Sequence, residues 1–217
     1  MSEVNVAPNW RIKTWFPDLD EAKLLQFKTY FLELLKFNKV VNLISSKGVL
    51  NADSTHFADS IISSKLVYAK LNHSVPLHDL GSGNGFPGVV LGILFPDQKV
   101  ILVDSDERKC EFLKHLIDTL KLTNISVHNR KIDLMDEGAI DQAICRGFAP
   151  LPKALLMLRK IVKSKGSIFH LKGNEWSMEV SQIPTQLCSV WQPSLLADYD
   201  LLGSDAKMYI VRTDRIL

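Results

Sequence analysis

The sequence has few cysteines, little net charge and no long hydrophobic run. Its three cysteines, Cys110, Cys145 and Cys188, are far apart and form no CxxC pair. This excludes a disulfide framework and a thiolate zinc site, and it is typical of reduced thiols in a cytoplasmic protein. The longest apolar run, residues 89–95, is too short to cross a bilayer, and no secretion signal, internal repeat or low-complexity segment is seen. We therefore expect neither membrane contact nor a bound metal.

The net charge of only +2 excludes a globally basic protein, so any affinity for nucleic acid must arise from local charge. Hydrophobic residues make up 46% of the 217 residues, which is enough for a substantial core. Apolar periodicity predicts helices over residues 20–38, 54–70, 87–95, 107–121 and 151–162, and strands over residues 77–80, 99–103, 125–128, 141–145, 167–171, 187–190 and 207–211.

Strands that alternate with helices predict an α/β fold with a mostly parallel sheet covered on both faces. The last strands have no full helix between them, which predicts an antiparallel edge strand on a seven-stranded sheet. The first 70 residues lack this alternation. We therefore expect a helical N-terminal extension over residues 1–70, packed on an α/β domain over residues 71–217.

A glycine-rich loop follows the first predicted strand, which carries Asp79 near its end. Glycine stands at every second position, at Gly81, Gly83 and Gly85. Glycine tolerates positive φ and has no Cβ, so such a loop lets backbone N–H groups approach a ligand closely. The dinucleotide pattern G-x-G-x-x-G would need glycine where Phe86 stands. The G-x-G-x-G form after an acidic strand end resembles the S-adenosylmethionine (SAM) loop of Rossmann-like methyltransferases.

The second strand ends at another acid, Asp104, 19 residues after Gly85. This interval is close to the one expected for a carboxylate that accepts both ribose hydroxyls of a nucleoside. An aspartate after a strand is also a common helix N-cap, although Ser105 or Asp106 could cap the next helix instead. The loop and the acid together predict nucleoside binding.

The third and fourth strands end at basic residues. Arg130 and Lys131 follow the third strand, where a methyltransferase-like fold borders the adenine ring, but they could equally be solvated surface charges. The fourth strand ends at Cys145 and Arg146 and lacks the Asn/Asp-Pro-Pro-aromatic turn of enzymes that methylate exocyclic amines. Cys145 could supply the thiolate of a cytosine-C5 enzyme. However, its place in the strand pattern is that of a small buried residue.

Arg146 has no acidic neighbour in the sequence, which favours a reaction without a general base. Guanine N7 is such a target, because it has an in-plane lone pair and loses no proton on methylation. Arg146 would then contact O6, a phosphate or the SAM carboxylate, since a bidentate pair with O6 and N7 would block the lone pair. The alternative is a salt bridge between Arg146 and a local acid.

A basic window lies between Asp141 and Glu175, where no acidic residue occurs. Its seven cations are Arg146, Lys153, Arg159, Lys160, Lys163, Lys165 and Lys172. Contacts between such cations and phosphates dominate nucleic-acid affinity. The window predicts a basic field beside the pocket, and the alternative is a solvated helix face.

Several motifs along the chain together resemble the RsmG (GidB) family of methyltransferases, which modify N7 of a guanosine in bacterial small-subunit ribosomal RNA. They are NLIS at residues 42–45 with HFADS at 56–60, DLGSGNGFPG at 79–88, VDS with RK and FL between 103 and 113, RGFA at 146–149 and LKG at 171–173. Gly147 stands where the family has alanine. By themselves, His56 and Asp59 could either join the N-terminal helices to the core or contact the substrate.

The resemblance implies a Rossmann-like SAM-dependent methyltransferase fold and gives roles to individual residues. Arg146 would lie at the transfer centre as the catalytic residue. SAM would contact Asp79, Gly81, Gly83, Gly85, Phe86, Asp104, Lys131, Ile132 and Arg146. RNA would contact Arg108, Arg130 and Lys172, joined by Lys153 and Lys160 of the basic window. The family often has an acid where this chain has Ile132, so only a backbone contact to adenine carries over there.

We therefore expect a monomeric, cytoplasmic enzyme that uses SAM to methylate guanine N7 in 16S ribosomal RNA, within the small subunit or an assembly intermediate. One alternative is a methyltransferase for another RNA, a small molecule or a protein, against which the basic window argues. The other is a nucleotide-binding or RNA-binding module without activity. The intact glycines and Asp104 argue against that alternative.

Overall fold

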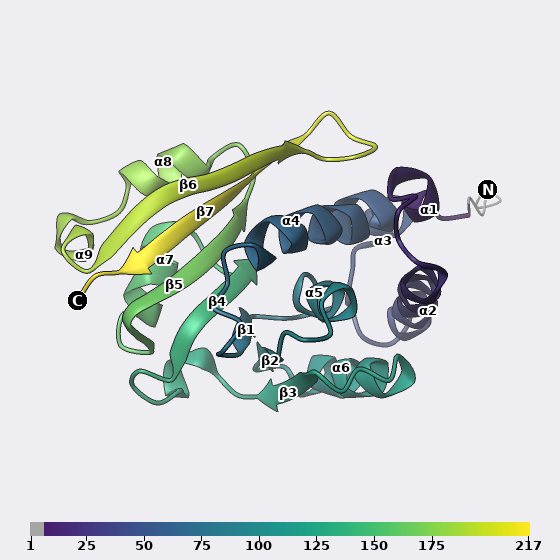
Figure 1. Cartoon of the computed structure of the whole chain (residues 1–217), viewed down its shortest axis with the longest axis horizontal. Helices are drawn as coiled ribbons and strands as arrows, with labels where there is room; N and C mark the ends of the chain where they lie inside the picture. The colour runs from purple at the N-terminus through teal and green to yellow at the C-terminus, as the bar shows by residue number, and fades with distance from the viewer. Residues whose placement is uncertain (1–6) are drawn as a thin grey trace.

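The computed structural model describes residues 7–217, which form one seven-stranded sheet with helices on both faces (Figure 1). The strands are β1 (Leu77–Leu80), β2 (Val100–Asp104), β3 (Ile125–Asn129), β4 (Ile140–Arg146), β5 (Val162–Lys172), β6 (Trp191–Asp200) and β7 (Lys207–Arg215), in the order β3-β2-β1-β4-β5-β7-β6. Strands β1 to β5 are parallel, and β7 is antiparallel to both of its neighbours, β5 and β6. The predicted α/β fold is confirmed, with the antiparallel strand one place in from the edge.

The helices fall into an N-terminal group and a group that alternates with the strands. They are α1 (Ile12–Trp15), α2 (Glu21–Phe37), α3 (Ser46–Leu50), the π-helix η1 (Asp53–Ala58), α4 (Asp59–Tyr68), α5 (Gly88–Leu94), α6 (Glu107–Thr119), the 3-10 helix η2 (Ile132–Leu134), α7 (Leu151–Leu158), α8 (Trp176–Ser181) and α9 (Thr185–Cys188). Within residues 7–217, no helix is both long and apolar enough to cross a membrane.

Side-chain alternation along the central strands builds two cores. In β4, Ile144 joins the cluster under α2, α4, α5 and α6, whereas its neighbours Ala143 and Cys145 join the cluster under α7 and α9. The same alternation separates Phe169 from Ile168 in β5. Successive side chains of a strand point to opposite faces, so a strand covered on both sides reads as a continuous apolar run.

The N-terminal helices contribute an aromatic cluster to the first of these cores. The rings of Phe27, Phe31 and Trp10 all meet Phe57 at centroid distances of 5.1–6.3 Å. Phe27, Phe31 and Phe57 share one buried cluster with Leu91 of α5. Helix α2 begins as its sequence predicts, because the Asp20 carboxylate accepts the backbone N–H of Lys23 as an N-cap. Residues 1–6 of the expected extension lie outside the described residues.

Three predicted elements differ from the structure. The predicted strand at 187–190 is wrong, because this segment is the end of helix α9 and the turn after it, and the strand that follows, β6, was not expected. Strand β6 contains Pro193 and is largely exposed, which an edge strand tolerates and which conceals it in the sequence. The predicted helix at 151–162 ends already at Leu158, and Val162 opens β5. The predicted helix at 54–70 starts as the π-helix η1.

Candidate active site

The glycine loop stands at the carboxyl end of β1, where a doubly wound sheet places its ligands. Gly81 and Gly83 have φ of +71° and +55°, which favour glycine. A Cβ on Gly83 would meet only the Gly81 carbonyl oxygen, at 3.7 Å, so the backbone at Gly83 faces open space. A Cβ on Gly85 would instead come within 2.6 Å of the Tyr30 hydroxyl. Gly85 therefore serves packing, and Gly83 is free to approach a ligand.

Asp104 lies against this loop. Its Oδ2 accepts the backbone N–H of Gly83 at 2.7 Å, and its Oδ1 accepts that of Asp106 at 2.9 Å. Asp106, and not Asp104, is the N-cap of α6, because its carboxylate accepts the N–H groups of Arg108 and Lys109. Each Asp104 oxygen keeps a second lone pair. The carboxylate is thus oriented and still able to accept the hydroxyls of a ribose, as the spacing predicts.

The Asp79 carboxyl is buried between β1 and α5. Its Oδ2 accepts the Gly88 backbone N–H at 2.9 Å. Burial raises the pKa of Asp79 to about 7, because desolvation penalises the charged form more than the Gly88 hydrogen bond and the positive charge of Arg146 favour it. The carboxyl therefore fixes the start of α5 behind the glycine loop.

The Phe86 ring does not face the open side of the loop, as a ring that lines the cofactor would. It is only 3% exposed and is stacked on Tyr30 at 4.7 Å and on His56 at 5.2 Å. The Tyr30 hydroxyl also donates to the Asn84 carbonyl at 2.6 Å. The N-terminal helices therefore hold the glycine loop from behind, and a ligand contact at Phe86 is left to its main chain.

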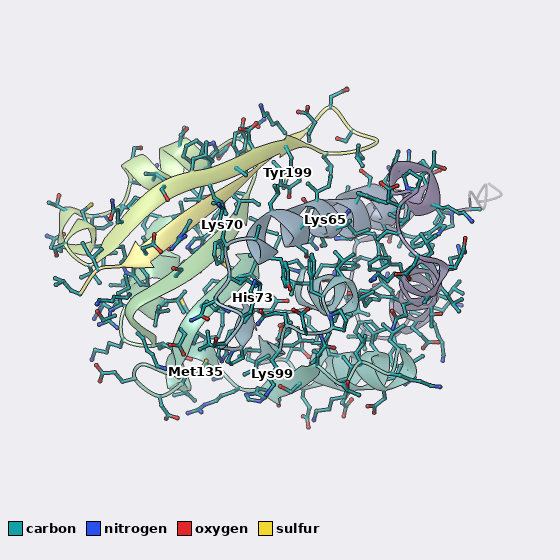
Figure 2. All side chains as sticks on the ribbon, in the orientation of Figure 1. Lys65, Lys70, His73, Lys99, Met135 and Tyr199 are labelled. Atoms are coloured by element: carbon teal, nitrogen blue, oxygen red, sulfur yellow. The ribbon has the colours of Figure 1, made fainter. Side chains whose placement is uncertain are left out.

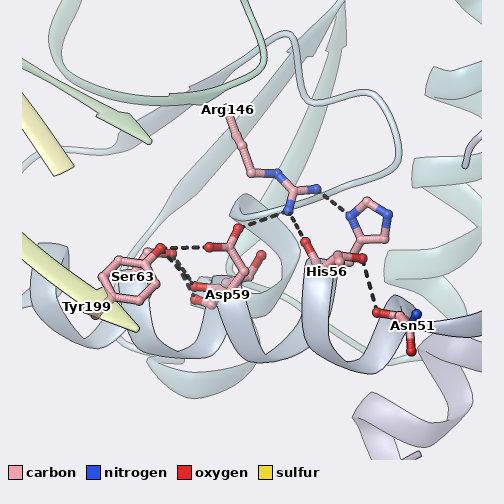
Figure 3. A network of polar contacts seen from close by, with 8 residues as sticks. Asn51, His56, Asp59, Ser63, Arg146 and Tyr199 are labelled. Carbon is pink, nitrogen blue, oxygen red and sulfur yellow. Dashed lines mark hydrogen bonds and ion pairs between the residues drawn. The ribbon is translucent and has the colours of Figure 1, made fainter. Parts of the chain in front are cut away.

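Arg146, at the end of β4, is held by three acceptors from the N-terminal helices (Figure 3). Its Nη1 donates to the Thr55 carbonyl and to Asp59 Oδ2, both at 3.0 Å, and its Nη2 donates to His56 Nδ1 at 2.8 Å. The expectation that Arg146 has no acidic neighbour is wrong, because Asp59 is 87 residues away in the sequence and adjacent in space. His56 and Asp59 do join the N-terminal helices to the core.

Within residues 7–217, neither of the two side chains bonded to Arg146 is a free base. Asp59 is buried, and its second oxygen accepts the Tyr199 hydroxyl at 2.7 Å. The pKa of His56 is lowered to about 3 by burial and by the charge of Arg146, so its imidazole is neutral and accepts a hydrogen bond. Both Asp59 oxygens and the His56 Nδ1 are therefore already bonded within the protein.

Cys145 is excluded as a nucleophile. It is 4% exposed, its Sγ lies 3.2 Å from His170 Nδ1, and burial raises the pKa of its thiol to about 12. The thiolate is the reactive form, so this thiol is inert at neutral pH. Its role is to pack between β4 and the helices α7 and α9.

The end of β3 gives a mixed outcome. Lys131 is exposed, whereas Ile132 is buried in the core cluster under α7 and α9. The Ile132 side chain therefore has little exposed surface with which to contact adenine. Arg130 is exposed and donates to the Leu134 carbonyl and to Asp136. Arg108, on the first turn of α6, is exposed beyond Asp104.

The basic window does not form one field, because the fold divides it between two ends of the sheet. Lys153 lies on the first turn of α7, near the end of β4, whereas the Lys160 carbonyl bonds Gly138 near the start of β4. Lys163 and Lys172 are separated by most of β5, on the order of 30 Å at ~3.3 Å per residue. Lys172 is 13% exposed and pairs with Glu179 at 2.7 Å. Arg146 and Lys172 are thus neutralised, and Lys153 is the exposed cation of the window nearest the site.

Comparisons with known proteins agree with this geometry. The family model GidB, described as rRNA small subunit methyltransferase G, matches residues 23–194. The chain belongs to this family. It is 49% identical over 208 residues to the ribosomal RNA small subunit methyltransferase G 3 of Bdellovibrio bacteriovorus, covering 95% of this chain and 94% of that one. It is 34% identical to the methyltransferase G of Paracoccus denitrificans, covering 71% and 78% of the two chains.

The fold is that of SAM-dependent methyltransferases. A crystal structure of a SAM-dependent methyltransferase from Aquifex aeolicus matches with a TM-score of 0.52 at 15% identity, covering 71% of this chain and 90% of that chain. The protein is therefore a GidB-family methyltransferase whose cofactor is SAM. The open backbone at Gly83 and the oriented carboxylate of Asp104 fit this cofactor.

Proposed function

We propose that the protein methylates N7 of a guanosine in the 16S ribosomal RNA of the small subunit. The family description and the relatives support ribosomal RNA as the substrate. The observation that carries the choice of N7 is the bonding around Arg146. Within residues 7–217, the two side chains bonded to Arg146, Asp59 and His56, are already engaged, and so neither is a free general base. Guanine N7 needs none, because it carries no proton.

Some residues of the site would hold the cofactor, and others would hold the guanine. When bound, SAM supplies an electrophilic methyl group on a positively charged sulfur. The backbone at Gly81 and Gly83 would receive its methionine part, and Asp104 its ribose, as anchored acceptors and donors do in nucleoside sites. Arg146 would contact the cofactor carboxylate or guanine O6 with its remaining N–H donors. Such a preoriented polar site stabilises the transfer of positive charge from sulfur to the purine.

The RNA would approach over the carboxyl ends of the strands. Arg108, Arg130 and Lys153 are exposed around this edge and suit contacts with phosphates. Lys131 would border the adenine, with Ile132 packed beneath it. Lys160 lies at the opposite end of α7, so its contact with RNA would require a substrate that reaches around the domain. Lys172 would act indirectly, since its ammonium holds Ala149 and Glu179 in place.

The remaining proposals concern assembly state and location. Residues 71–217 would form the SAM-binding domain, with the preceding segment as an extension that shapes the substrate side of the pocket. The enzyme would act as a monomer in the cytoplasm, where bacterial ribosomal RNA is transcribed and assembled. Its substrate would be the small subunit or an assembly intermediate.

Methyl transfer from tritiated SAM to 30S particles and to naked 16S RNA tests the proposal directly. Aniline scission after borohydride reduction, which cleaves at 7-methylguanosine, should map the label to one nucleotide. The single-turnover rate at saturating SAM should stay within about threefold between pH 6.5 and 8.5, since no deprotonated nucleophile is required. Label that resists scission, or a rate that rises about tenfold per pH unit, would refute the assignment to N7.

A further inference from the structure

We propose that the π-helix η1 and the start of α4 form a socket that positions Arg146. The socket consists of the Thr55 carbonyl, the His56 imidazole and the Asp59 carboxylate, and Tyr199 supports it through Asp59, so that Asp59, His56 and Tyr199 are positioning residues. The inference rests on the proposed function, in which Arg146 contacts the cofactor or guanine. In an α-helix the Asp59 N–H would donate to the Thr55 carbonyl, four residues earlier. Here it donates to Ser54 and His56 instead. The Thr55 carbonyl is therefore left to accept from Arg146 Nη1 at 3.0 Å.

The socket matches the guanidinium chemically. A guanidinium offers five N–H donors and no acceptor, and the socket supplies a carbonyl, an imidazole nitrogen and a carboxylate oxygen. The Arg146 side chain is 17% exposed, and its Cζ lies 5.4 Å from the Phe86 ring centroid. Three of the five N–H groups are used, so within residues 7–217 the Nε–H and one Nη2–H are left for a ligand. Their direction is fixed because the other donors are fixed.

The C-terminal hairpin supports this socket from a distant part of the sequence. The Tyr199 hydroxyl donates to Asp59 Oδ1 at 2.7 Å, and Tyr199 of β6 lies over α4 (Figure 2). The Ser54 hydroxyl donates to the Leu202 carbonyl at 2.5 Å, beyond the end of β6. Asp59 is thus held between Tyr199 and Arg146 with both oxygens bonded. Strand β6, which the sequence patterns did not predict, is therefore connected to Arg146 through the Asp59 carboxylate.

A double-mutant cycle separates positioning from general structural support. Asp59→Asn should weaken SAM binding by calorimetry and slow single-turnover transfer by about tenfold, a coupling typical of bonded neighbours. In an Arg146→Gln background the same change should cost less than about twofold, because the group that Asp59 positions is gone. Tyr199→Phe, which removes one hydroxyl, should show the same pattern with about a threefold effect and keeps the test valid if Asp59→Asn folds poorly.

Asp53→Asn is the matched control, because Asp53 is buried like Asp59 but lies on η1 and pairs with Arg11 at 2.8 Å, not with Arg146. It should lower the melting temperature and change SAM affinity by less than about twofold. Equal losses from Asp59→Asn in both backgrounds, or none in either, would overturn the socket. Failure of the proposed function is distinguishable, since a wild-type protein that binds SAM but labels no 30S particle refutes the function and leaves the binding cycle interpretable.

Discussion

Replacing Asp79 with asparagine should stabilise the protein above neutral pH. Asparagine has the shape of aspartate, and its side-chain oxygen can still accept the Gly88 N–H, which lies 2.9 Å from Asp79 Oδ2. The substitution removes the penalty for burying a charge. Desolvation raises the pKa of Asp79 from 3.8 to about 7, so the native state disfavours the carboxylate.

The magnitude and sign follow from this change. A rise in pKa from 3.8 to about 7 corresponds to about 4 kcal/mol at pH values above 7. Between these two values the native protein binds one proton more than the unfolded chain. The stability of the wild type relative to Asp79→Asn is therefore highest below about pH 4, falls by about 1.4 kcal/mol per pH unit, and is constant again above about pH 7.

Urea unfolding of both proteins at pH 5 and pH 8 measures this difference. The advantage of Asp79→Asn should be larger at pH 8 than at pH 5 by about 3 kcal/mol. Asp205→Asn, an exposed change in the β6–β7 turn, should alter stability by less than about 0.5 kcal/mol at both pH values. An advantage of equal size at pH 5 and pH 8 would refute the reasoning about Asp79.

Three further changes test the site and its surroundings. Asp104→Ala should weaken SAM binding by at least about tenfold in calorimetry, because it removes a charged acceptor and leaves the Gly83 N–H without its hydrogen bond to Asp104. Unchanged affinity would reject the ribose contact. Gly83→Ala should weaken SAM binding far more than Gly138→Ala, which has a similar φ of +65° but lies outside the site, and equal affinities would show that no ligand approaches this backbone. Lys153→Ala should lower RNA affinity and the salt slope of filter binding by about one, and a larger effect of Lys160→Ala would place the RNA at the opposite edge.

The sequence predicted the sheet and the loop because these depend on local patterns. Strands β1, β2 and β4 are largely buried on both faces, so each is a short apolar run between turns, and their ends mark the site at Asp79, Asp104 and Arg146. Strand β6 was missed because it alternates irregularly, contains Pro193 and is exposed along much of its length. Its pairing with β7 stabilises it, and that is a tertiary effect.

The partners of Arg146 could not be predicted for the same reason. Asp59 and Tyr199 lie 87 and 53 positions from Arg146, and no periodicity connects them. The HFADS motif identified His56 and Asp59 as a pair of interest without saying what they contact. The basic window was misleading because residues that are close in sequence lie far apart along an extended strand. Strand β5 is long enough to place Lys163 and Lys172 at opposite ends of the sheet.

The central claim is that SAM binds between the glycine turn at Gly81–Gly83 and the carboxylate of Asp104. A crystal structure with S-adenosylhomocysteine tests it most directly. The account predicts that the ribose hydroxyls lie within about 3 Å of the Asp104 oxygens and that the amino-acid part of the ligand lies along the backbone at Gly81 and Gly83. A ligand bound elsewhere, such as the 470 Å³ cavity beside Pro76 and Lys99 at the amino ends of the strands, would contradict it.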